Sequence, residues 1–147
     1  MVQTATTLFI TLGSAALFVY WFRYTSLLIL SAKTTRDFAG EIAEAHNLQF
    51  QKVQSELRAA AGNLDSLQNA LDTDYRRIQM LLSDCGSCET RLEDRMLAIN
   101  YRLTGAWFKL VKTIAPDTAM RSLNEMSMIV AHFANTLGER NAQASAA

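Results

Sequence analysis

Hydrophobic residues in the middle of the chain recur at alternating steps of three and four. On a helix this spacing gathers them on one side, which is how helices pack against one another. The pattern predicts one long helix from Ala43 to Leu82. Asp74 interrupts the apolar row, and we expect it to fix the register or to pair with Arg77. The predicted packing seam of this helix comprises Phe50, Val53, Leu57, Leu64, Leu67, Leu71 and Ile78.

The same spacing continues in the second half of the chain and predicts two shorter helices. The first ends near Pro116, because proline disfavours helix for the residue before it and suits the first position of the next helix. We expect the second of them to end at Gly138 and residues 141–147 to form a frayed tail. The predicted seam of these two helices comprises Leu92, Ile99, Leu103, Leu123, Val130 and Phe133.

The N-terminal region lacks charged residues from Ala5 to Phe22. At about 1.5 Å per residue such a helix spans roughly 27 Å of hydrocarbon, which suffices to cross a bilayer. We therefore predict a transmembrane anchor over residues 1–32. Aromatic and basic side chains at the end of this run are typical of a membrane interface, and they are Tyr20, Trp21, Arg23, Tyr24 and Lys33.

A cleaved signal peptide is the main alternative to a retained anchor. However, no Lys or Arg precedes the hydrophobic run, and Leu30-Ser31-Ala32 is a poor cleavage site. The basic residues near the run all follow it, beginning with Arg23. By the positive-inside rule, the N-terminus should face outward and the C-terminal domain should lie in the cytoplasm.

The predicted fold class is all-α, with a cytoplasmic helical hairpin or coiled coil over residues 33–140. One proline, six glycines and few alternating runs of β-forming residues support this class. Two paths are open at Gly86. The chain either reverses there, giving antiparallel helices, or continues straight, so that a parallel dimer brings four thiols together.

Cys85 and Cys88 form the one motif with potential chemistry. Two cysteines at this spacing form a disulfide, a thiol pair or half of a four-sulfur metal site. No second such pair occurs, and no histidine follows Cys88 as in haem attachment. We favour a turn between helices, with reduced thiols in the cytoplasm. The alternative function is a membrane-tethered redox or metal-binding module.

Charge excludes one broad class of partner. The chain has 14 Lys and Arg and 14 Asp and Glu, so no net positive field favours nucleic acid. The sequence lacks a Ser-His-Asp set and a glycine-rich phosphate loop. We therefore expect no enzyme activity, no cofactor and no small-molecule substrate. The sequence predicts a single-pass membrane-anchored scaffold or interaction protein that binds a protein partner or forms a homo-oligomer.

Overall fold

The computed structural model describes residues 1–32, 34, 36–85 and 91–147. These residues form six helices and no strand, so the predicted all-α class is confirmed. The contacts divide the chain into two units, residues 1–32 and residues 33–147, which are described separately below.

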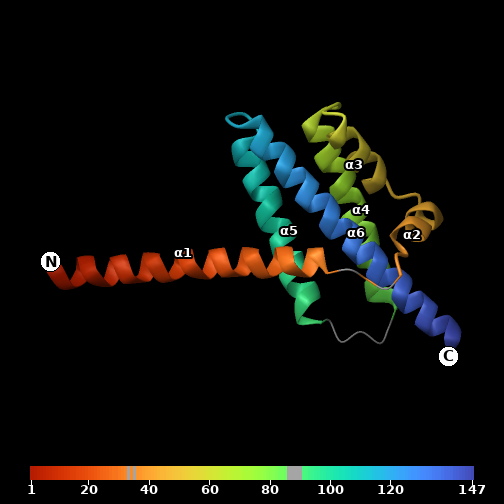
Figure 1. Ribbon diagram of the computed structural model, residues 1–147, viewed down its shortest axis with the longest axis horizontal. Helices are drawn as coiled ribbons and strands as arrows, with labels where there is room; N and C mark the ends of the chain where they lie inside the picture. Colours follow the sequence, from red (N-terminus) through yellow and green to blue (C-terminus); the bar gives the residue numbers. More distant parts are fainter. Residues whose placement is uncertain (33, 35, 86–90) are drawn as a thin grey trace. The chain divides into compact units, whose positions relative to one another are not determined.

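The first unit is a single helix, α1 (Val2–Ser31; Figure 1). Its 30 residues give a length of about 45 Å. It ends at Ser31, and the next residue, Ala32, has extended backbone angles. The long apolar helix expected at the N-terminus is therefore present, and it is long and apolar enough to cross a membrane by length and composition.

In the second unit, the prediction of a single long helix from Ala43 to Leu82 is wrong. Three helices occupy this region, namely α2 (Ala39–His46), α3 (Phe50–Arg58) and α4 (Leu64–Asp84). Two short connections separate them, and each contains residues with left-handed backbone angles. Asn47 ends α2 with a φ of 53°. Ala60 and Gly62 follow α3 with φ angles of 49° and 98°.

The start of α4 shows why a new helix begins there. The side chain of Asn63 accepts a hydrogen bond from the backbone N–H of Asp65, at 2.9 Å, and so caps the helix. Gly62 adopts a backbone conformation that side chains disfavour. These two residues stop the helical pattern even though hydrophobic residues keep their spacing across the turn.

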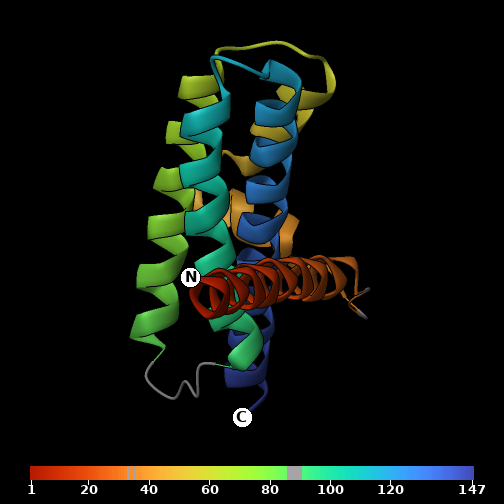
Figure 2. The same ribbon diagram turned by 90° about the vertical axis from the view of Figure 1, so that its left-hand side faces the viewer.

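The remaining helices are α5 (Leu92–Val111) and α6 (Pro116–Ala146). Pro116 is the first residue of α6, as predicted. α6 packs against α2, α3, α4 and α5, and it is the ribbon that runs from lighter to dark blue in Figure 2. Its fully buried side chains form the centre of the core, and they include Leu123, Met126, Ile129, Val130 and Phe133.

Gly138 was expected to end this helix, but α6 continues through it to Ala146 and includes the segment predicted to be a tail. A Cβ atom at residue 138 would overlap the Cβ atom of Phe38. The absence of a side chain at Gly138 therefore lets α6 approach the residue that precedes α2. The glycine serves close packing rather than helix termination.

Side chains also join α4 to α5. Gln68 Nε2 donates to the carbonyl oxygen of Gly105 at 3.5 Å, and Lys112 Nζ lies 2.7 Å from Asp65 Oδ1. The first contact pairs a residue early in α4 with one late in α5, and the second pairs Asp65 with the residue that directly follows α5.

Candidate functional site

The side chains predicted at the membrane interface lie near the end of α1. Tyr20, Trp21 and Tyr24 are exposed, and the rings of Tyr20 and Tyr24 stack at 6.5 Å between centroids. Arg23 is half-buried, and Lys33 lies outside the described residues. The three aromatic rings are therefore available to a polar–apolar boundary.

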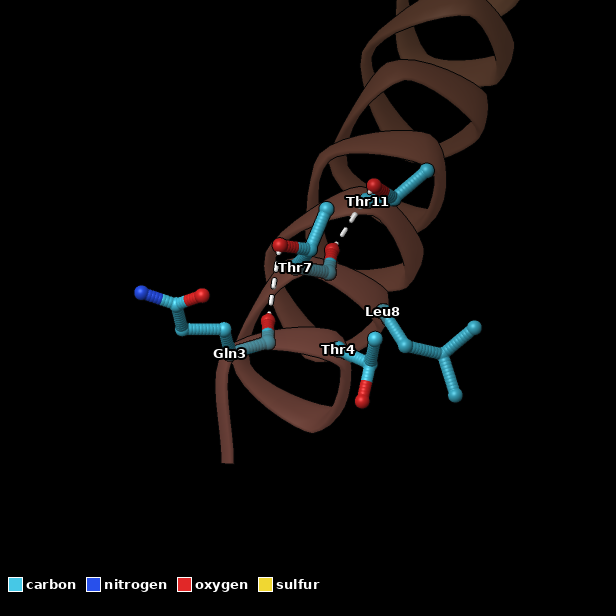
Figure 3. Close-up of a pocket in the computed structure, with 5 residues that line it drawn as sticks. All are labelled: Gln3, Thr4, Thr7, Leu8 and Thr11. Atoms are coloured by element: carbon cyan, nitrogen blue, oxygen red, sulfur yellow. Dashed lines mark hydrogen bonds between the residues drawn. The ribbon is translucent and has the colours of Figure 1, made fainter. Parts of the chain in front are cut away.

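Threonine hydroxyls in the first turns of α1 are satisfied within the helix. Thr7 Oγ1 donates to the carbonyl oxygen of Gln3 and Thr11 Oγ1 to that of Thr7, both at 2.8 Å (Figure 3). Thr6 bonds to Val2 in the same way. These bonds remove the cost of placing a hydroxyl in an apolar medium. The side chains that line the pocket of Figure 3 all belong to this one helix.

Most residues of the predicted packing seam contribute to the core of the second unit. Leu64 is half-buried at the start of α4. The buried members come from α3, α4 and α6, and they are Phe50, Val53, Leu57, Leu67, Leu71, Ile78, Leu123, Val130 and Phe133.

The predicted seam of α5 lies elsewhere. Leu92, Ile99 and Leu103 are exposed, and the buried apolar side chains of this helix are Leu97, Tyr101 and Phe108. The side of α5 that faces the core is therefore not the side on which apolar residues recur most regularly. The exposed row, which we call the α5 outer face, comprises Leu92, Ile99, Leu103, Trp107, Leu110 and Ile114, each between 51% and 84% exposed.

Two tyrosines that the sequence pattern did not single out connect α4, α5 and α6. The rings of Tyr75 and Tyr101 stack at 4.1 Å with an interplanar angle of 6°, and Tyr75 meets Phe133 edge-on at 5.9 Å. Tyr101 Oη donates to Asp72 Oδ1 at 2.8 Å. Burial raises the pKa of both phenols, and the Asp72 carboxylate raises that of Tyr101 further. Both phenols stay neutral and act as packing and hydrogen-bonding groups.

Asp74 has a different partner from the one predicted. Its Oδ2 accepts a hydrogen bond of 2.6 Å from the backbone N–H of Gln49, immediately before α3. Arg77 acts on it only through a charge interaction. Burial raises the pKa of Asp74, although the backbone hydrogen bonds from Gln49 and Phe50 oppose this shift. Asp74 thus caps a helix that precedes it in the chain, which spacing along one helix does not reveal.

The cysteine motif falls largely outside the described residues. Cys85 is exposed at the end of α4, whereas Cys88 lies in the segment 86–90 that is not described. Among described residues, no three His, Cys, Asp or Glu side chains come together as metal ligands. The predictions for Cys85 and Cys88 therefore stay predictions.

Comparisons with known proteins add no assignment. The chain matches no family model, no curated protein and no solved structure.

Proposed function

We propose that this chain is a single-pass membrane protein whose second unit acts as a helical scaffold for interactions. The observation that carries the proposal is the surface of α1. Large apolar side chains are exposed along its length, among them Leu8, Phe9, Leu12, Leu17 and Phe18. A helix with apolar side chains on every side is stable in lipid, and in water it exposes far more apolar surface than soluble proteins do.

The internal hydrogen bonds of Thr6, Thr7 and Thr11 support the same proposal. In the hydrocarbon region, no water satisfies a hydroxyl, and bonding to the preceding turn is the local solution. We place Tyr20, Trp21 and Tyr24 at the headgroup level, where aromatic rings are favoured.

The proposed orientation follows from the basic residues. Arg23, Lys33 and Arg36 all follow the apolar run, which favours a cytoplasmic second unit and an outward N-terminus. The proposed role of that unit is to hold an interaction surface near the membrane, and this role requires no catalytic group. The contacts between α4 and α5, such as Gln68 with Gly105, support an antiparallel helical bundle as the scaffold.

Membrane extraction tests the anchor. The full chain, expressed in cells, should stay in the membrane fraction after washing at alkaline pH and should float with lipid. Replacing Leu8 and Leu12 by Arg places two charges in the apolar run, at a cost of about 2.5–3.5 kcal/mol each. That variant should move to the soluble fraction, whereas Ser31→Arg with Ala32→Arg, a matched pair at the basic end, should not. A native chain that washes off the membrane would refute the proposal.

Protease protection tests the orientation separately. With tags at both ends of the chain, protease added to sealed inside-out vesicles should remove the C-terminal tag and spare the N-terminal tag. The opposite result would reverse the orientation while leaving the anchor intact.

A further inference from the structure

The α5 outer face exposes six large apolar side chains, whereas three large apolar side chains of this helix are buried in the core. It extends from Leu92 to Ile114, beyond the last residue of α5, and includes Trp107. Contiguous apolar patches of this kind mark sites where a protein meets another surface.

A row of basic residues runs beside this face. Arg95, Arg102 and Lys109 are seven residues apart and therefore lie in line, and Arg91 extends the row by one turn. All four are exposed. α5 contains two acidic residues, of which Glu93 is exposed and Asp94 is buried beside Arg140. The outward side of α5 thus combines an apolar stripe with a positive flank.

We propose that the α5 outer face lies on a lipid surface that carries anionic headgroups. An amphipathic helix with Leu, Ile and Trp on one side and Lys and Arg beside them is suited to the boundary between headgroups and acyl chains. The anionic lipids of the cytoplasmic leaflet attract such basic residues. The inference rests on the proposed function, because the anchor supplies the membrane to which this face binds.

The charges argue against a second copy as the occupant. If two α5 helices packed stripe to stripe in antiparallel order, their basic rows would face each other. In parallel order each row would face the flank that holds Glu93, Asn100 and Trp107. Glu93 and the Glu125 carboxylate bonded to Asn100 supply two negative charges there, fewer than the four basic residues of the row. An anionic bilayer complements the row directly.

Fluorescence of Trp107 tests the proposal in the full chain. Trp21→Phe leaves Trp107 as the sole tryptophan, since the chain has two. This chain is reconstituted in phosphatidylcholine vesicles with or without phosphatidylglycerol, in which the lipid tails are brominated near the headgroup. We expect bromine to quench Trp107, and to quench it at least about twofold more strongly when phosphatidylglycerol is present.

Charge removal on α5 provides the matched comparison. Replacing Arg95, Arg102 and Lys109 by Gln should abolish the difference between the two lipid mixtures. Replacing Arg58, Arg76 and Arg121 by Gln removes the same charge from exposed positions of α3, α4 and α6 and should leave the difference unchanged. Near-ultraviolet circular dichroism verifies that each variant keeps its fold.

Two outcomes would overturn the proposal. One is a chain that floats with the vesicles while Trp107 is not quenched in the anionic mixture, which would leave the anchor intact and remove only this inference. The other is disulfide crosslinking between chains through Leu103→Cys, in a background with Cys85 and Cys88 replaced by Ser, which would assign the face to a second copy. A chain that does not float at all would instead refute the proposed function.

Discussion

The backbone N–H of Phe38 donates a hydrogen bond of 2.7 Å to Oδ1 of Asn135, which joins the residue before α2 to the second half of α6. One turn further along α6, Gly138 faces the same phenylalanine. The hydrogen bond and the missing side chain together allow this close approach.

Gly138→Ala should therefore destabilise the second unit. The new methyl group would overlap Phe38, and overpacking outweighs the gain in helix propensity, so we expect a net loss of about 1–2 kcal/mol. Chemical denaturation of the full chain in detergent measures this loss. Gly105→Ala is the matched control, because the nearest atom to its new methyl, Met126 Cε, is 3.5 Å away and no loss is expected. Equal stability of the two variants would contradict the packing role.

Asp74 provides a test that separates hydrogen bonding from charge. Asp74→Ala removes the acceptor for the Gln49 N–H and should cost about 1–3 kcal/mol. Asp74→Asn keeps an acceptor oxygen without the charge, and it should retain most of the stability at neutral pH. The two variants are compared by thermal unfolding. If both lose stability equally, the carboxylate charge rather than the acceptor is what the fold needs.

The pH dependence of Asp74 has a defined sign. Burial raises its pKa above the usual 3.8, so protonation favours the folded state. Its contribution to the free energy of unfolding should increase as the pH falls through the raised pKa, and Asp74→Asn should lack this increase. Unfolding measured as a function of pH in the two proteins shows the difference, and identical profiles would contradict the assigned shift.

His132 should have the opposite dependence. Burial lowers its pKa below 6.5, although the carboxylates of Asp94, Glu93 and Glu139 act against this shift and Arg140 pairs with Asp94. Because the unfolded chain binds the proton more readily, stability is retained above about pH 6.5 and is lost as the pH falls below it. His132→Gln should lose less stability on acidification. A titration of the His132 ring by NMR with a midpoint above 6.5 would rule this out.

The hydrogen bond between Tyr101 and Asp72 should stabilise the contact between α4 and α5. Tyr101→Phe keeps the stacking on Tyr75 and removes only the hydroxyl, at an expected cost of about 1–2 kcal/mol. Asp72→Ala, made alone and combined with Tyr101→Phe, removes the acceptor and completes a double-mutant cycle. We expect a coupling energy of about 1 kcal/mol, and strictly additive effects would show that the bond contributes nothing.

The helical class and the apolar α1 were predictable, because composition and spacing act locally and bear directly on helix formation. The helix breaks were not predicted, because a seven-residue apolar spacing continues across both connections. It comprises Ala43, Phe50, Leu57, Leu64 and Leu71. Asn47 and the pair Gly62-Asn63 carried the local signals, as a left-handed cap and a helix start.

The apolar spacing did not predict which side of α5 faces the core, and the reason is different. This helix has two usable sides, and the more regular one, which contains Leu103, faces outward. The inward side includes Tyr101 and Gly105, whose partners Asp72 and Gln68 are more than two dozen residues away in the chain. Such contacts depend on tertiary structure, which periodicity along a single helix does not encode.

The position of α6 in the chain has a consequence for biosynthesis. A ribosome produces α2, α3, α4 and α5 before the helix that all four contact. Until α6 emerges, their apolar sides have no completed core, and we expect the nascent chain to engage chaperones at this stage. Premature termination before residue 116 would leave the same surfaces exposed and mark the fragment for degradation.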